Sequence, residues 1–444
     1  MDHGLSQEQR ALLLRPLTHT GRYFYIVFGI LLVFIGWFLY AWYYQLTNGL
    51  GVTGMRTPVG ASWGLYIVNF VFFIGITHAG IAIAAGIRLF KLHDYAALAR
   101  IAELVTILSL VAAGVCIILD MGRPDRIFNV ILTYPWRVSS SPLVWDITAV
   151  TTYLVFALTY LYIEMRGDLA MLAGKVRWGW LYRRMIPAYN PGERKRVERI
   201  VFYASIFNFP IMVMVHTTVA WIFGLQVGRP EWYSAVKGPY YVFGAVLTGV
   251  ATVVVMAAIY RWVFHWEEFI KPLVFRGLGR FLSWVSIFYL YFILADFMTI
   301  KWGGPLPELK VMEAKTAGDF AFLYWFEVIS LAIGFTVFLI NTLFNKVFRV
   351  WSTVAASALV VVALWVGRYI IVVPSLTNGF LPFPTGSYQP TWVEWSLTVG
   401  AFAIVALGFM VFTKVLPIIP FTEMEHIAEG KFTKVEPVLG EEKE

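Results

Sequence analysis

The segment WGLYIVNFVFFIGITHAGIAIAAGIRLF, residues 63–90, decides the fold of this 444-residue chain. Its only basic side chains are His78 and Arg88, and it contains no acidic residue. A helix needs about 20 apolar residues to cross the hydrocarbon core of a bilayer. This run is longer than that, so we expect a transmembrane helix here.

The same criterion finds further apolar runs along the whole chain. Together they cover residues 23–44, 63–90, 101–120, 143–164, 201–224, 240–262, 281–300, 320–345, 350–373 and 393–417. The composition agrees, because only 14% of the residues are charged, against about 25% in soluble domains. The sequence predicts an all-α polytopic membrane protein with about ten transmembrane helices. Its transmembrane domain, 23–418, would lie between an N-terminal segment, 1–22, and a C-terminal tail, 419–444.

Basic residues gather in alternate loops of this scheme. The loop at 165–200 holds Arg166, Lys175, Arg177, Arg183, Arg184, Arg194, Lys195, Arg196 and Arg199. By contrast, the loop after the first run holds only Arg56. Because loops rich in Lys and Arg stay in the cytoplasm, we expect both termini to be cytoplasmic, in the plasma membrane of a prokaryote. The formal net charge of +8 is then a determinant of topology, and the partner is the lipid bilayer and not nucleic acid.

The chain has a single cysteine, Cys116, inside an apolar run. An iron–sulfur cluster requires about four thiolates, so we expect no such cluster in this chain. No cluster of metal ligands is visible in the sequence either, and we predict no metal site. We interpret Cys116 as a small core residue and not as a reactive thiol.

Ionisable side chains inside a membrane are costly, so each one suggests a functional role. Those within or near the runs are His78, Glu103, Asp120, Asp146, His216, Asp296, Glu327 and Arg368. The direction of the runs places the carboxylates near the outer face and His78 deeper. The densest group is LDMGRPDR, 119–126, which contains Asp120, Arg123 and Asp125. For Asp125 and its basic neighbours, a solvated network of ion pairs without function is the competing interpretation.

A quinol site needs groups that hydrogen-bond two ring oxygens and accept two protons. A histidine beside a carboxylate can do both, and the pocket must open to lipid for the isoprenoid tail. We therefore hypothesise that His78 and Asp146 hold and deprotonate a quinol, and that Asp120 with Arg123 passes protons outward. The competing interpretation of His78 and His216 is a satisfied contact between helices. Pro210, six residues before His216, is expected to open its helix locally.

Several stretches resemble the NrfD/PsrC family, the membrane subunits of polysulfide-reductase-like enzymes. They are SWGLYIVNFVFFIGITHAG (62–80), LDMGRPDR (119–126), SSPLVWDITAVTTY (140–153), VMVHTTVAW (213–221) and YQPTWVEW (388–395). The chain is also similar to the membrane subunits of alternative complex III and of Hdr-like menaquinol oxidoreductases. The resemblance implies two four-helix bundles, at about 63–224 and 240–373, with no haem. It also implies menaquinone or ubiquinone bound near the outer face.

The resemblance further implies partners and residue roles. The partners would be a ferredoxin-like iron–sulfur subunit and a catalytic or cytochrome subunit. His78, Asp120 and Asp146 would be the quinone and proton residues, with Arg123 and Asp125 lining the mouth of the site. Quinone binding or a proton path would involve the four remaining candidates, which are His216, Asp296, Glu327 and Arg368.

Two other functions remain open at this point. A b-type cytochrome would need paired axial histidines, for which His78 and His216 are the available pair. A secondary transporter would need broken helices near the middle of the membrane, and only Pro210 interrupts a run there. The crowding of ionisable residues toward one face favours the quinone-handling subunit over both.

Overall fold

The computed structural model describes residues 5–55, 61–186, 190, 192, 194–380 and 387–428. All regular secondary structure in these residues is helical. Within these described ranges, ten helical segments are long and apolar enough to cross a membrane, which confirms the expected fold class. Arg56, part of the topology argument, and the tail from 429 onward lie outside the described residues.

The spanning helices follow the order of the predicted runs. They are α2 (Arg22–Asn48), α3 to α5 (Leu65–Ile76, His78–Gly80 and Gly86–Leu89, with a π-helix at Ile81–Ala85), α6 (Ala96–Asp120), α8 (Pro142–Leu172), α10 (Arg194–Gly224), α11 (Lys237–Phe264), α12 (Pro272–Gly303), α14 (Ala321–Leu343), α15 (Val350–Thr377) and α16 (Trp392–Val415). The shorter α-helices are α1 (Gln7–Thr18), α7 (Phe128–Arg137), α9 (Gly179–Met185), α13 (Leu306–Thr316) and α17 (Phe421–Ala428). Single 3-10 turns cover Leu50–Val52, His93–Tyr95 and Pro124–Ile127.

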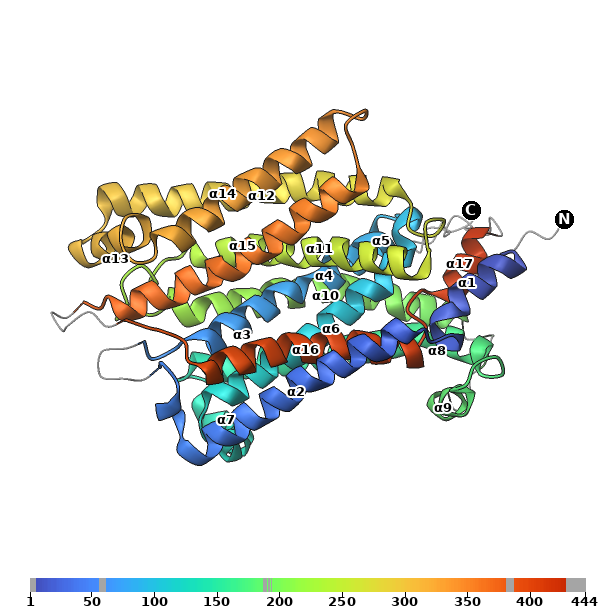
Figure 1. Ribbon diagram of the computed structural model, residues 1–444, viewed down its shortest axis with the longest axis horizontal. Coiled ribbons are helices and arrows are strands. Elements are labelled where there is room, and N and C mark those ends of the chain that lie inside the picture. The colour runs from blue at the N-terminus through green and yellow to red at the C-terminus, as the bar shows by residue number, and fades with distance from the viewer. Residues whose placement is uncertain are drawn as a thin grey trace, which may run out of the picture.

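The long helices form two packed groups. The span made of α3, α4 and α5 packs with α6, α8 and α10 in the first group, and α11, α12, α14 and α15 pack in the second. The first and last spans, α2 and α16, pair with each other, and α16 also covers α6. Figure 1 shows the long helices running side by side, with α1, α9 and α17 at one end of the molecule and α7 and α13 at the other. We call these the α1/α17 end and the α7/α13 end.

The two groups meet where small residues allow the backbones to approach. A Cβ atom on Gly249 of α11 would lie 2.6 Å from the backbone nitrogen of Ala79 in α4. Within lipid there is little hydrophobic force between helices, so such close contacts and buried polar bonds hold spans together. The position of Gly249 therefore fixes α4, and with it His78, against the second group.

Pro210 does not open its helix, and that expectation is wrong: α10 is one continuous helix across it. The irregular span is the one that carries His78, where α3 ends at Ile76 and a π-helix begins at Ile81. Such irregular backbone is tolerated at membrane depth only where protein groups satisfy the freed hydrogen-bonding atoms. Those groups are Thr106 and Tyr153, as described below.

The first part of the C-terminal tail is a helix that packs on the first group. The carboxylate of Asp168 in α8 accepts hydrogen bonds from the backbone N–H groups of Phe421 (3.1 Å) and Thr422 (2.7 Å), and from the Thr422 hydroxyl. Arg100 of α6 is paired with Asp168 at 2.7 Å and donates to the carbonyls of Pro417 and Ile419. A buried Arg–Asp pair thus holds α17 against α6 and α8 of the first group.

Glu423 makes this attachment sensitive to pH. Burial raises the pKa of its carboxyl from 4.5 to about 7, although Arg88 nearby opposes the shift. Because the docked helix holds the proton more tightly than the free helix, docking is strongest at low pH and weakens as the pH rises through about 7. We expect residues 421–428 to exchange amide hydrogens faster at pH 8 than at pH 5 after correction for intrinsic rates. Glu423→Gln should remove that difference, and an unchanged difference in this variant would contradict the assignment.

Candidate functional site

His78 of α4 and His216 of α10 form a buried pair. The pair joins the irregular span to α10. Their ring centroids are 3.9 Å apart and the rings meet edge to face. The Nε2 atom of His78 lies 3.2 Å from the carbonyl oxygen of Met212. The Nδ1 atom of His78 and both ring nitrogens of His216 have no hydrogen-bond partner among the described residues. The pair is therefore only partly satisfied, which differs from the competing interpretation of a fully satisfied core contact.

A network of hydroxyl groups supports the backbone next to His78. The carbonyl oxygen of Thr77 accepts hydrogen bonds from the hydroxyls of Thr106 (2.7 Å) and Tyr153 (3.0 Å). The Thr106 hydroxyl in turn accepts from the backbone N–H of Gly80 at 2.8 Å. A Cβ at Gly80 would lie 2.3 Å from that hydroxyl oxygen, so only glycine permits this arrangement. The position of His78 thus depends on α6 and α8.

Asp146 lies in the first turns of α8, with 1% of its surface exposed. Within the part of the chain that the structure describes, neither carboxylate oxygen has a hydrogen-bond partner. Asp146 and Tyr153 are seven residues apart and share one face of the helix, so Asp146 lies about 10 Å nearer the α7/α13 end than Tyr153, at ~1.5 Å of rise per residue. Tyr153 is the residue whose hydroxyl bonds the Thr77 carbonyl. Asp146 and His78 therefore occupy successive levels along the helix axis.

Asp120 is buried at the end of α6, beside polar groups from two other spans. The side-chain amide of Gln45 in α2 donates to the carbonyl of the preceding residue, Leu119, at 2.9 Å. The hydroxyl of Tyr66 in α3 donates to the Gln45 side chain at 2.5 Å. These bonds tie α2, α3 and α6 together at the α7/α13 end.

Arg123 and Asp125 lie on the surface beyond α6. They form a two-pronged ion pair, with distances of 3.0 and 2.8 Å, and both side chains are more than half exposed. The hydrogen bond from Arg123 lowers the pKa of the Asp125 carboxyl. Exposed pairs of this kind contribute little to stability. Arg123 and Asp125 are therefore solvated, whereas the candidates Asp120 and Asp146 are buried.

Arg368 of α15 lies between the two groups of helices. It is buried, its guanidinium stands 4.9 Å from the centroid of the Tyr241 ring, and its two terminal nitrogens have no hydrogen-bond partner in the described ranges. A cation in this setting is stabilised by the ring face and by nearby anions. A Cβ on Gly244 would lie 2.7 Å from Arg368 Nη2, so glycine is required for the guanidinium to fit.

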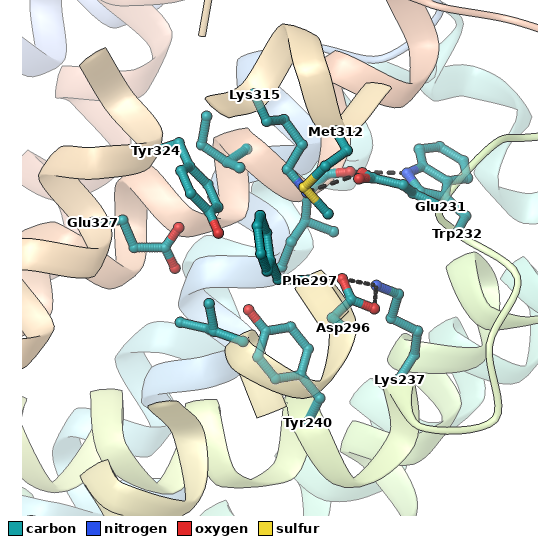
Figure 2. A pocket seen from close by; sticks show the side chains of 13 residues that line it. Glu231, Trp232, Lys237, Tyr240, Asp296, Phe297, Met312, Lys315, Tyr324 and Glu327 are labelled. Atoms are coloured by element: carbon teal, nitrogen blue, oxygen red, sulfur yellow. Dashed lines mark hydrogen bonds and ion pairs between the residues drawn. The ribbon is translucent and has the colours of Figure 1, made fainter. Parts of the chain in front are cut away.

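A small polar cavity of about 30 Å³ lies in the second group, near the α7/α13 end. Figure 2 shows the carboxylate of Glu327 and the hydroxyls of Tyr324 and Tyr240 turned toward a common space. The Lys237 ammonium pairs with Asp296 at 3.3 Å on the other side of the cavity (Figure 2). The volume is enough for about two water molecules. Asp296 and Glu327 therefore line one cavity that is large enough for water, and Arg368 is not among its lining residues.

Sequence reasoning missed three charged residues of this cavity, and two of them are Glu231 and Lys315. They form a buried ion pair of 2.9 Å. Although burial favours the neutral amine, the carboxylates of Glu231 and Asp296 raise the pKa of Lys315, so it stays protonated. Both residues lie in sequence regions that resemble water-exposed loops, and no spacing rule joins positions so far apart. Lys237, at the start of α11, was missed for the same reason.

A second polar cluster, also missed, lies at the α1/α17 end of the first group. In it Arg88 pairs with Glu164 at 2.6 Å and Arg100 with Asp168 at 2.7 Å. Only Glu103 had been singled out there. The spacing of Glu164 and Asp168, four residues apart on one helix, was the available signal, because such residues share a face.

The disposition of the histidines bears on haem and metal binding. A haem with two axial histidines requires the porphyrin plane to lie between the rings. The rings of His78 and His216 are in direct contact, which leaves no space for it. In the described part of the chain no three His, Cys, Asp or Glu side chains are grouped as metal ligands.

Replacing Thr106 with valine tests the support of His78. Valine keeps the shape but removes the hydroxyl, so the Gly80 N–H loses its partner and the Thr77 carbonyl keeps only Tyr153. We expect a loss of about 1–3 kcal/mol, the usual cost of leaving a buried polar group unsatisfied. Thermal unfolding of the purified protein in detergent measures it. Thr159→Val, at an exposed site where the hydroxyl bonds only its own helix, is the control and should change little. Equal unfolding temperatures for both variants would refute the network.

Comparison with known proteins places the chain in a family. One relative, from Halobacterium salinarum, is provisionally named as a dimethyl sulfoxide reductase membrane subunit and is 28% identical over 90% of this chain and 92% of the relative. A selenate reductase subunit of Mesobacillus selenatarsenatis is 23% identical over 88% and 93%. The Hdr-like menaquinol oxidoreductase integral membrane subunit of Archaeoglobus fulgidus is 21% identical over 87% and 92%. The family model of polysulphide reductase, NrfD, matches residues 51–378, and the chain belongs to that family.

Proposed function

We propose that this chain is the quinone-binding membrane subunit of a quinol-linked respiratory oxidoreductase, with its quinone site in the first group of helices. One observation carries the proposal. Asp146 is buried in a membrane span, and neither of its carboxylate oxygens has a hydrogen-bond partner among the residues that the structure describes. Leaving such a group unsatisfied is costly, so a bound molecule that brings hydrogen-bond donors is the simplest compensation.

The relatives support this class of function. One of them is named as the membrane subunit of a menaquinol oxidoreductase, and two as subunits of reductases. We extend this to the present chain and propose menaquinone or ubiquinone as the bound molecule, since both offer two ring oxygens. A quinol supplies two hydrogen-bonding hydroxyl groups and releases two electrons and two protons when it is oxidised.

In this proposal Asp146 and His78 hold the two ends of the ring. Asp146 and Tyr153, whose hydroxyl bonds the Thr77 carbonyl, are about 10 Å apart along the axis of α8. That rise is comparable to a six-membered ring with a hydrogen bond of ~2.8 Å at each end. Asp146 accepts a proton on a carboxylate oxygen, and His78, backed by His216, accepts one on its Nδ1 atom. Because both residues are buried, the ring reaches them only when neighbouring side chains move apart.

Protons leaving Asp146 would pass by way of Asp120 to the surface, where Arg123 and Asp125 line the mouth. Water can protonate and deprotonate groups at this end because both members of that pair are exposed. The cavity of the second group, with Glu327 and Asp296, and Arg368 between the groups are proposed as a separate proton path. The cavity is large enough to hold water, and each carboxylate that lines it has a polar neighbour. Water in the cavity could therefore carry protons between them.

Electrons would be exchanged with a partner protein. The chain has one cysteine, which cannot hold an iron–sulfur cluster by itself. We therefore propose a ferredoxin-like iron–sulfur subunit docked at the α7/α13 end, with a catalytic or cytochrome subunit beyond it. This end is close to Asp146, so the electron path from the ring would be short.

Asp146→Asn tests the central residue. Asparagine keeps the size but cannot take up the proton, so quinol-linked electron transfer by the intact complex should fall by at least about a hundredfold, the usual contribution of a positioned acid or base. His78→Ala should cause a similar loss, and both complexes should still assemble. The measurement is quinol oxidation by the purified complex, together with gel electrophoresis to show that all of its proteins are present.

Two further variants make the outcome specific. Glu267→Gln, at an exposed site of the opposite end, should leave turnover unchanged, and Asp125→Asn should have a smaller effect than Asp146→Asn because Asp125 is solvated. Normal turnover in both Asp146→Asn and His78→Ala would exclude the proposed site.

A further inference from the structure

An apolar groove of about 310 Å³ lies between α6, α8 and α16, and Met185 of α9 borders it. Its walls include Leu104 of α6, Leu161 and Met165 of α8, and Phe412 of α16. Leu158, with 47% of its surface exposed, lies on the open side that faces the surrounding lipid. The groove has about ten times the volume of the polar cavity in the second group, and its lining offers water almost no partners.

The groove occupies the half of the first group nearer the α1/α17 end. Along α16 it extends from Gly408 to Leu416, about 12 Å at ~1.5 Å of rise per residue. Gly408 lets α16 pack closely on α6, because a Cβ there would lie 2.5 Å from the Leu108 side chain. The depth and the apolar lining suit part of a hydrocarbon chain lying along the helices, since an empty groove would forfeit its dispersion contacts.

Three basic residues of α8 and α9 lie close in sequence to lining residues of the groove. Arg166 follows Tyr162 by four residues on α8, so it continues the row of side chains that lines the groove. Its buried Nε atom has no hydrogen-bond partner within the described ranges. Arg183 and Arg184 directly precede Met185 on α9, and both are exposed. Cationic groups at the level of the headgroups attract anionic lipids.

We propose that this groove is a binding site for an anionic phospholipid, with an acyl chain between α6, α8 and α16 and its phosphate on Arg166 and Arg184. The unpartnered Arg166 Nε supplies a donor suited to a phosphate oxygen, and the exposed Arg184 adds charge. The site is at the opposite end of the molecule from Asp146, so it stands independently of the proposed quinone site.

Native mass spectrometry of the purified full chain, titrated with phosphatidylglycerol or with phosphatidylcholine carrying the same acyl chains, tests the proposal. Phosphatidylglycerol should bind at least about tenfold more tightly, which corresponds to ~1.4 kcal/mol. Arg166→Gln combined with Arg184→Gln should remove this preference, because it weakens phosphatidylglycerol more than phosphatidylcholine, whose choline ammonium offsets the charge of its phosphate. Lys346→Gln, an exposed residue near the same end, should preserve the preference.

Filling the groove separates the acyl-chain part of the proposal from the headgroup part. Leu158→Trp should weaken both lipids about tenfold, whereas Val155→Trp, at a 59% exposed position of α8 that does not line the groove, should not. Leu158→Phe serves if the tryptophan variant does not fold. Equal affinity of the wild type for the two lipids would overturn the proposal. Equal effects of Val155→Trp and Leu158→Trp on lipid affinity would also overturn it. A quinone that displaces phosphatidylglycerol from the wild type, but not from Leu158→Trp, would overturn the assignment of the occupant.

Discussion

The carbonyl oxygen of Thr77 is the point on which the rest of the first group depends. The span that carries His78 departs from regular α-helix there, and no water within the membrane could satisfy the freed backbone atoms. Thr106 and Tyr153 do so from two other helices, α6 and α8. The same bonds set the rotation and depth of His78, so the irregular span and the buried histidine have one common cause.

Polar groups inside this protein fall into two kinds. Some are paired with an opposite charge, such as Arg100 with Asp168, and these hold the helices and the tail together. Others are buried with atoms that find no partner among the described residues, such as Asp146, His216 and Arg368. Because burying a polar atom without a partner costs free energy, the second kind requires a compensating reason. Functional chemistry is the reason that we propose for Asp146 and His78.

The sequence was sufficient to predict the membrane fold and the order of its spans. Hydropathy reports directly on which helices lie in lipid, and for that reason the runs and the helices agree. Pairings between distant spans were not predictable, since the contact of His78 with His216 or of Glu231 with Lys315 depends on how the helices are arranged. The break near His78 was also missed, whereas Pro210 gave a false signal, because packing and hydroxyl groups decide where a span bends.

The pairing of α2 with α16 has a consequence for biogenesis. These helices are the first and last spans of the chain, and each has the other as a principal neighbour. During synthesis the N-terminal span is inserted long before its neighbour exists, since chains grow at roughly 5–20 residues per second. Most of its surface faces lipid in the finished protein as well, so waiting exposes little that would aggregate. The ribosome must therefore have translated α16 before α2 can pack against it.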